Sequence, residues 1–197
     1  AAGGDYVFFR INPDAETSPP GNHSWSLQTS NGGATGETTI GAANDDGMVN
    51  DSGDVEAGGA SANVGENTAP KVANYVIPLQ LGNLGADEEI IDANFSVNVE
   101  AVNDFLADGN MPFNADLYGL AFRKSGAISN GDFYQGALDA KAHLIQNDIL
   151  TVNTQTGAVE LSAVGRQQLT DYVNTQIEMG AKAGDYLFLR FSPDAID

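Results

Sequence analysis

The sequence predicts a mostly β protein, an antiparallel β-sandwich or jelly roll that carries one or two short helices. Short runs of β-branched and aromatic residues are separated by loops rich in Gly, Asn, Asp and Ser, which is the pattern of an antiparallel β protein. Residues 91–102 alternate between apolar and polar side chains, as a strand with one solvated face does. A strand-like segment near the start of the chain also returns near its end.

The repeated segment is the most informative feature of the chain. GDYVFFRINPDA at residues 4–15 returns 180 positions later as GDYLFLRFSPDA at residues 184–195, with eight of the twelve positions identical. Self-similarity at a fixed period is typical of repeat arrays and assemblies. Both faces of a strand over residues 5–11 are largely apolar, so such a strand needs cover on both faces and partners along its edges. Pro13 ends it, because proline has no N–H to donate to a neighbouring strand.

The repeat divides the chain into two parts. Residues 1–17 hold the first copy, and we expect them to be the end of a preceding repeat or a strand exchanged with a neighbour. Residues 18–197 are expected to form a single β-sandwich domain. Its loop-rich part, residues 18–70, contains no Lys or Arg. Short strands such as residues 24–29 are expected there, since about fifty structureless residues would be unusual in a compact domain.

The other elements follow from residue patterns further along the chain. Apolar runs and alternation predict strands at residues 72–81, 91–102, 116–123 and 185–191. Apolar residues near helical spacing predict helices at residues 130–146 and 162–178. Ser162 is a suitable N-cap for the second helix, and Gly180 is placed to end it.

The composition excludes several classes of partner. The chain has 27 acidic and 8 basic residues and a formal net charge of −19. Nucleic-acid binding needs a basic surface that neutralises phosphates, and anionic lipid attracts basic segments, so neither partner is expected. No run of about 18 apolar residues is present, so no insertion into a membrane is expected. The chain has no cysteine, which excludes disulfides and thiolate chemistry.

No catalytic constellation is present in the sequence, and we do not expect an enzyme. The two histidines, His23 and His143, lie in no metal-binding motif. No nucleophile-elbow motif is present for a serine triad. Paired carboxylates for glycoside hydrolysis come from distant strands, so choosing two among 27 acidic residues would be arbitrary. His143 is expected on the surface or at the core edge of the first predicted helix.

Acidic residues cluster at residues 44–54, in the sequence NDDGMVNDSGD. Calcium takes about six to eight oxygen ligands, and Gly-containing loops can supply them. One interpretation is a calcium site with the ligands Asp45, Asp46, Asp51 and Asp54. The EF-hand spacing is not met, and we favour the alternative that this segment is a solvated, self-repelling loop.

Trp25 is the only tryptophan and lies in a part of the chain that is poor in apolar residues. An exposed aromatic ring on a β-sandwich can stack against a sugar ring. Trp25 would then be a carbohydrate-binding residue, and polysaccharide would be a partner. The alternative, which we favour, is that Trp25 anchors the loop-rich part of the domain onto the core.

The last two thirds of the chain also resemble a known kind of domain. NLG at residues 83–85, DLYGL at 116–120, LIQNDILT at 144–151 and GDYLFLR at 184–190 follow one another in this order. This order is similar to that in a domain of secreted bacterial surface proteins that carry carboxy-terminal sorting signals. The resemblance covers residues 72–195. It implies a β-sandwich and an extracellular or cell-surface location, and it assigns no binding residue.

The repeated strand and the resemblance favour one function, an extracellular structural module. The chain would be a subunit of a surface filament or a repeat of a large surface protein, with head-to-tail copies of itself as partners. Strand addition joins chains through main-chain hydrogen bonds, and a head-to-tail exchange propagates as a filament. The residues that would carry the exchange are Asp5, Tyr6, Val7, Phe8, Phe9, Arg10, Ile11, Tyr186, Phe188 and Arg190.

Two alternatives stay open. One is a carbohydrate-binding module of a secreted protein, based on the predicted fold, which is an argument by analogy, and on Trp25. The other is that both copies lie in one sheet of one monomer, as products of an old strand duplication. The strand-exchange interpretation assumes that one subunit offers a single slot for which the two copies compete.

Overall fold

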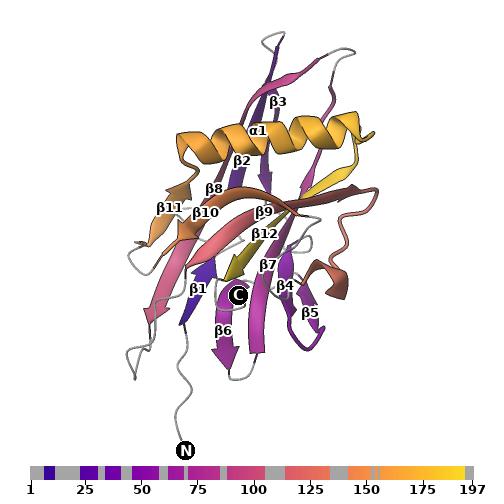
Figure 1. The fold of residues 1–197 in the computed structure, drawn as a ribbon. Helices are drawn as coiled ribbons and strands as arrows, with labels where there is room; N and C mark the ends of the chain where they lie inside the picture. Colours follow the sequence, from indigo (N-terminus) through magenta and orange to yellow (C-terminus); the bar gives the residue numbers. More distant parts are fainter. Residues whose placement is uncertain are drawn as a thin grey trace, which may run out of the picture.

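The computed structural model describes residues 7–11, 23–30, 34–40, 46–57, 62–68, 71–84, 88–104, 114–133, 142–151, 154 and 156–193. Its elements, in order along the chain, are β1 (Val7–Ile11), β2 (His23–Thr29), β3 (Ala34–Ile40), β4 (Gly47–Asn50), β5 (Val55–Ala57), β6 (Ala62–Thr68), β7 (Lys71–Gln80), β8 (Ile90–Asp104), β9 (Ala115–Arg123), the 3-10 helix η1 (Asn130–Asp132), β10 (His143–Leu150), β11 (Gly157–Glu160), α1 (Ala163–Glu178) and β12 (Tyr186–Pro193). Figure 1 shows these strands with α1 lying across them. Every described strand pair is antiparallel, which confirms the predicted mostly β, antiparallel class.

The strands join in one hydrogen-bonded order, β10-β9-β12-β7-β6-β1-β8-β2-β3, with β11 on β8 and with β4 and β5 beside β7. The long strand β7 pairs with β12 along residues 75–80 and with β6 along residues 71–73, whereas β4 pairs with residues 73–76. Because a strand has two edges, β12 and β6 follow each other along one edge of β7, and β4 occupies the other.

The long strand β8 is arranged in the same way. It pairs with β2 along residues 90–96 and with β1 along residues 99–104, whereas β11 pairs with residues 96–99. β2 and β1 therefore follow each other along one edge of β8, and β11 covers part of the other edge. β6 pairs with both β7 and β1, so it connects the two groups of strands.

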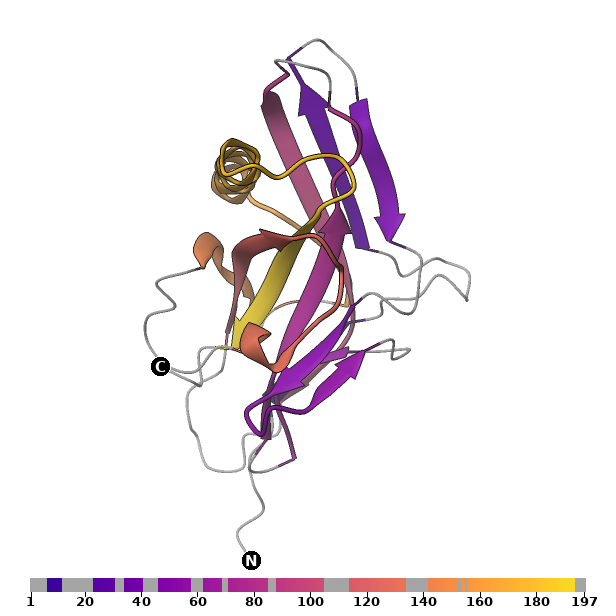
Figure 2. The ribbon, with the colours of Figure 1, turned by 90° about the vertical axis from the view of Figure 1, so that its right-hand side faces the viewer.

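The strands fold over into two layers, one around β7 and β12 and the other around β8 and β2 (Figures 1 and 2). The Phe191 ring of β12 lies 6.2 Å from the Phe95 ring of β8, although β7, β6 and β1 separate these two strands in the hydrogen-bonded order. Facing antiparallel layers are the architecture of a β-sandwich, as the sequence predicts. The jelly-roll strand order stays a prediction.

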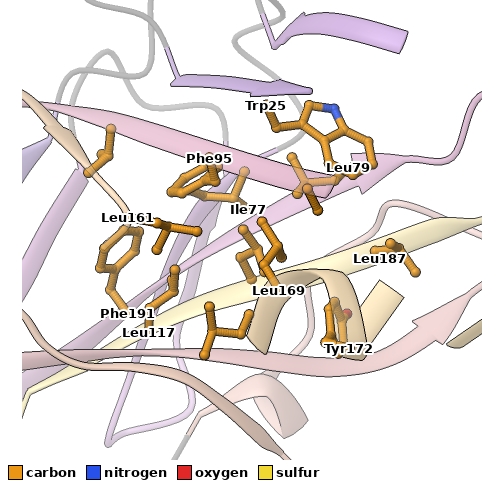
Figure 3. Close-up of a cluster of buried hydrophobic side chains, with 14 of the residues drawn as sticks. Trp25, Ile77, Leu79, Phe95, Leu117, Leu161, Leu169, Tyr172, Leu187 and Phe191 are labelled. Atoms are coloured by element: carbon orange, nitrogen blue, oxygen red, sulfur yellow. The ribbon is translucent and has the colours of Figure 1, made fainter. Parts of the chain in front are cut away.

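Side chains from both layers and from α1 fill the space between them (Figure 3). The predicted alternation along β8 is present, because Phe95, Val97 and Val99 are buried and the polar residues between them are partly exposed. The strands predicted at residues 72–81, 116–123 and 185–191 correspond to β7, β9 and β12. Large members of the core are Trp25, Leu27, Tyr75, Ile77, Leu79, Phe95, Leu117, Leu169, Tyr172, Leu187, Leu189 and Phe191.

The helix α1 begins and ends where the sequence predicts. Ser162 is the N-cap, and its Oγ accepts a hydrogen bond from Gly165 N at 3.1 Å. Gly180 follows the helix with a φ of +103°, a left-handed conformation that favours glycine. Tyr172 and Val173 are among the residues that the helix buries in the core. Local signals were sufficient to predict this element, because both of its ends carry capping residues.

Polar side chains of α1 cover a part of the β8 edge that no described strand pairs with. Asn174 Oδ1 accepts a hydrogen bond from Ile90 N at 3.1 Å, and Asn174 Nδ2 donates to Ile90 O at 2.8 Å. Thr170 Oγ1 accepts from Ala93 N at 2.9 Å. These side chains satisfy backbone groups that an adjoining strand would otherwise satisfy.

The same helix is tied to the other layer. Gln176 Oε1 accepts a hydrogen bond from Phe122 N of β9 at 3.0 Å, beyond the segment of β9 that pairs with β10. Figure 2 views α1 nearly end-on. The helix therefore connects β8 with β9, at a place where β-strands of the two layers do not pair in the described structure.

The prediction of a helix at residues 130–146 is wrong. Asn130–Asp132 form one turn of 3-10 helix and His143–Leu150 form β10, which pairs with β9. Residues 134–141 lie outside the described residues. A short apolar run does not distinguish a helix from a strand, and pairing with β9 favours the strand. His143 therefore lies on a strand and not on a helix.

Candidate functional site: the slots of the repeated strands

The second copy of the repeated segment forms β12, which lies between β7 and β9. Leu189 pairs with Ile77 on one edge and with Gly119 on the other. Alternate residues such as Leu187 lie in the main core, whereas Phe188 belongs to a second buried cluster. This strand is buried along nearly its whole length, so both of its faces are covered.

A pair of charged residues covers the second face of β12. The Arg123 guanidinium lies 3.5 Å from the centre of the Phe188 ring, which is a cation–π contact. Arg123 Nη2 donates to Asp132 Oδ2 at 3.0 Å, and the same oxygen accepts a hydrogen bond from Ser129 N at 2.8 Å. No local sequence pattern indicates this pair, because a strand residue meets a turn residue that follows nine positions later.

Arg190 is buried on the same side of β12, with 1% of its surface exposed. Its Nε donates to Ser192 Oγ at 2.9 Å, and its Nη1 donates to the Asp132 carbonyl at 3.3 Å. The guanidinium carbon lies 5.4 Å from the centre of the Tyr118 ring of β9. A buried charge needs such partners, so Arg190 binds β12 to its own chain. Tyr186, at the start of β12, is partly buried against the second cluster.

Tyr172 of α1 connects β12 with β9. Its hydroxyl donates to Leu120 O at 2.6 Å and accepts from Phe188 N at 3.3 Å. The ring fills the space beside Gly119, where an added Cβ would lie 2.5 Å from ring carbons. Burial raises the pKa of the Tyr172 hydroxyl above its ordinary value, so burial favours the protonated form that makes these hydrogen bonds.

The Gly-Asp pair that begins the repeat forms the corner before β12. Gly184 has a φ of +88°, a conformation that favours glycine. Asp185 Oδ2 accepts hydrogen bonds from Lys124 Nζ at 2.7 Å and from Lys182 N at 2.9 Å. The hydrogen bond from Lys124 is the largest cause that lowers the pKa of the Asp185 carboxyl, and it outweighs the opposite effect of desolvation. The Gly-Asp pair that both copies share thus has a structural role in the second copy.

The first copy forms β1, which lies between β6 and β8 of the same chain. Phe9 pairs with Val64 of β6 and with Val102 of β8. The assumption that one subunit offers a single slot is therefore wrong, because each copy has a slot of its own with antiparallel partners on both edges. Both copies lie in one hydrogen-bonded order of one chain, as the alternative of a strand duplication states. Asp5 and Tyr6 lie outside the described residues. The members of the predicted exchange set that form β1 are Val7, Phe8, Phe9, Arg10 and Ile11.

The four aspartates predicted as calcium ligands have different surroundings. Asp46 is buried and accepts a hydrogen bond from Tyr75 Oη. Asp51 and Asp54 lie at the turn between β4 and β5, and Asp45 lies outside the described residues. In the described part of the chain, no three His, Cys, Asp or Glu side chains are grouped so that they could hold a metal ion.

Asn50 organises the turn between β4 and β5. Its Oδ1 accepts hydrogen bonds from Ser52 N and Asp54 N, each at 3.0 Å, and its Nδ2 donates to Asp54 Oδ2 at 3.2 Å. Gly53 has a φ of +81° in the same turn. Asn, Asp, Ser and Gly are the residues that tight turns favour, so the geometry of this hairpin accounts for the composition of residues 50–54.

Trp25 has 2% of its surface exposed and lies in the main core (Figure 3). Neither face of the indole is available to a sugar ring. Trp25 pairs with Phe95 of β8, so it anchors β2 to the long strand of the second layer. His23 begins β2, and His143 Nε2 lies 3.2 Å from Gln168 Oε1 of α1.

The chain matches no family model, no curated protein and no solved structure. Within the ranges that the structure describes, no helix has the length and apolar character needed to cross a membrane.

Proposed function

We propose that the chain is an extracellular structural module that joins copies of itself by exchange of β1. The observation that carries this proposal is that one chain contains two slots for nearly the same strand. The slot between β6 and β8 holds β1, and the slot between β7 and β9 holds β12, with antiparallel pairing on both edges in each case. Such slots bind a strand largely through main-chain hydrogen bonds, which any copy of the chain can supply.

The departure of β1 exposes edges that a second copy can use. In the described hydrogen-bonded order, β1 is the sole link between β6 and β8. Its departure leaves unpaired N–H and C=O groups on both of these strands, and unpaired edges are sites of strand addition. The β1 of a second copy restores the same hydrogen bonds between chains. The free-energy difference is then mainly the entropy of association, so exchange depends on protein concentration.

Exchange in one direction produces an assembly and not a closed pair. A chain that donates β1 keeps an empty slot, which accepts β1 from a third copy. Head-to-tail contacts of this kind continue until a geometric closure occurs, and a filament or linked surface array results. The extracellular location rests on the resemblance of residues 72–195 to secreted bacterial surface domains. The net charge of −19 suits a saline medium in which copies can approach each other.

Engineered cysteines can report which chain fills the slot, because the native chain contains none. Phe9→Cys with Val102→Cys, or Arg10→Cys with Ala101→Cys, places two thiols on register partners across β1 and β8. Adjacent pairs alternate between the hydrogen-bonded and the closer type, so one of the two designs suits a disulfide. In concentrated protein we expect covalent dimers and longer ladders on non-reducing gels, and their share should rise with concentration.

The matched control places the cysteines across β12 and β7, with Leu189→Cys and Ile77→Cys. Both positions lie in the core, and intrachain disulfides are expected at every concentration. The proposal is overturned if both β1–β8 designs form intrachain disulfides alone and electron microscopy shows particles of monomer size in the same samples.

A further inference from the structure

A groove of about 500 Å³ lies between β10 and the first turns of α1. This volume is within the range of small-molecule sites in proteins. None of its lining residues is charged, although the chain as a whole has a net charge of −19. We name it the β10–α1 groove, and its defining residues are Leu144, Gln146, Asn147, Ser162, Val164 and Gln168.

The amides of the β10–α1 groove keep hydrogen-bonding capacity that the described protein does not use. Gln146 Oε1 accepts from Ser162 N at 2.8 Å, and Gln168 Oε1 lies 3.2 Å from His143 Nε2. Within the described part of the chain, the Nε2 group of neither glutamine has an acceptor. Asn147 donates through Nδ2, and its Oδ1 accepts nothing from the described residues. The groove thus offers two amide donors and one amide acceptor.

The position of Gln146 is fixed by close packing. An added Cβ at Gly165 would lie 2.2 Å from Gln146 Oε1. The start of α1 can therefore approach β10 this closely because residue 165 is glycine. The hydrogen bond from Ser162 N holds the same amide, so one of the amides that line the groove has a fixed position.

Two exposed aliphatic side chains complete the lining. Leu144 is 43% exposed and Val164 is 71% exposed, and both line the groove. Exposed aliphatic groups beside unused amide groups suit a ligand with hydroxyl groups on its rim and C–H groups on its face. A pyranose ring has this distribution of polar and apolar surface.

An added peptide strand fits this place less well. β10 lies at the end of the hydrogen-bonded order, but its register against β9 shifts between Leu144 and Gln146 and again between Gln146 and Leu150. Asp148 also has a φ of +52°. Such irregularities interrupt the row of N–H and C=O groups that strand addition requires. A compact ligand is therefore favoured over an extended chain.

We propose that the β10–α1 groove binds a neutral saccharide unit. The Nε2 groups of Gln146 and Gln168 donate to hydroxyl oxygens, Asn147 Oδ1 accepts from a hydroxyl, and Leu144 and Val164 contact the C–H face of the ring. The uncharged lining offers no cation to a uronate or sulfated sugar, and the net charge of the chain repels anions at long range. This site is separate from β1 exchange, so either proposal can fail alone.

The test is a titration of the full chain followed by ¹H–¹⁵N NMR. The probes are the methyl glycosides of glucose, galactose, mannose and N-acetylglucosamine, with glucuronate as the charged comparison. At least one neutral glycoside is expected to bind with millimolar affinity and to shift the side-chain NH₂ signals of Gln146 and Gln168. Gln168→Leu should weaken binding by about tenfold, as expected for one lost hydrogen bond, and Asn147→Ala should weaken it several-fold.

Gln167→Leu is the matched control, because Gln167 is exposed on α1 and donates to Asp171 at 2.9 Å without lining the groove. It should bind as the wild type does. Unchanged signals outside the groove show that the variants are folded. The proposal is overturned if no neutral glycoside shifts the groove signals at tens of millimolar, if Gln168→Leu and Asn147→Ala both bind like the wild type, or if glucuronate binds more tightly than every neutral probe.

Discussion

Tyr172 and Gly119 restrict each other more closely than their positions in the sequence suggest. The Tyr172 ring occupies the space that a side chain at residue 119 would need, and its hydroxyl joins the backbone of β9 to that of β12. Protein interiors are packed as densely as organic crystals and accommodate added atoms poorly. Gly119 is therefore required for packing and not for its backbone conformation.

Gly119→Ala is expected to lower the free energy of unfolding by about 2 kcal/mol, the typical effect of overpacking a core. Gly82→Ala is the control, since nothing lies within 4 Å of an added Cβ there, and little change is expected. Urea denaturation followed by the fluorescence of Trp25 measures both. Equal urea midpoints for Gly119→Ala and the wild type would contradict the close packing of the Tyr172 ring against Gly119.

Asp185 predicts how stability depends on pH. Its pKa in the folded protein is lowered, first by the hydrogen bond from Lys124. A carboxyl with a lowered folded pKa stabilises the fold above its unfolded pKa, and this contribution is lost as the pH falls through the folded value. Asp185→Asn should therefore be less stable than the wild type at neutral pH, and the difference should shrink below about pH 4. A difference that stays constant across a pH series of denaturation midpoints would argue against this role.

Among the elements, α1 has the role that a strand usually has in a sandwich. It covers the free part of the β8 edge through Asn174 and Thr170 and reaches β9 through Gln176. The polar residues on the buried face of this helix thus have backbone partners in both layers. Buried polar groups are stable when they are paired in this way.

Asn174→Leu is expected to destabilise the protein by about 2 kcal/mol, because Ile90 N and Ile90 O both lose their partner. Asn74→Leu is the contrasting variant. The Asn74 side chain is fully buried in β7, and neither of its amide atoms has a hydrogen-bond partner among the residues that the structure describes. An apolar side chain of similar size should therefore leave stability unchanged or raise it. Chemical denaturation measures the free energy of unfolding of both variants. An equal decrease in this free energy for Asn174→Leu and Asn74→Leu would contradict the assigned role of Asn174.

The elements with strong local patterns could be predicted from the sequence. β7, β8, β9 and β12 have long apolar or alternating runs, and α1 has Ser162 and Gly180 at its ends. β10 was missed because its apolar residues also fit helical spacing, and pairing with β9 decides its conformation. The individual strands β3, β4, β5, β6 and β11 are short or polar, so only their neighbours in the sheet define them.

The candidate site shows the same division. The repeated segment could be found from the sequence, and its buried second copy agrees with its apolar character. The existence of a second slot could not be predicted from the sequence, because this slot depends on how β6 and β8 pair with β1. Arg123, Asp132 and Gln146 were also missed, since each takes its role from contacts with distant residues. The favoured interpretation of Trp25, an anchor that packs onto the core, agrees with its burial.

For the whole molecule, the net charge of −19 opposes the approach of two copies. Salt screens exposed charges over about 8 Å at physiological ionic strength. The exchanged fraction of the β1–β8 cysteine variants should therefore rise with sodium chloride, as measured by light scattering after size exclusion. Calcium chloride at the same ionic strength is the comparison. Screening alone should raise the exchanged fraction equally in both salts, whereas a larger rise with calcium chloride would indicate specific binding of calcium. A fraction that falls as salt is added would contradict an electrostatic barrier to assembly.

The side-chain hydrogen bonds of α1 also protect an edge of β8 from foreign strands. Asn174 and Thr170 hold the amides of Ile90 and Ala93, while β8 stays paired with β2 on its other edge. An unpaired edge is a site of strand addition, and α1 cannot leave this one without removing Leu169, Tyr172 and Val173 from the core. Exposure of the edge is therefore coupled to loss of core packing, which protects the folded protein from aggregation along β8.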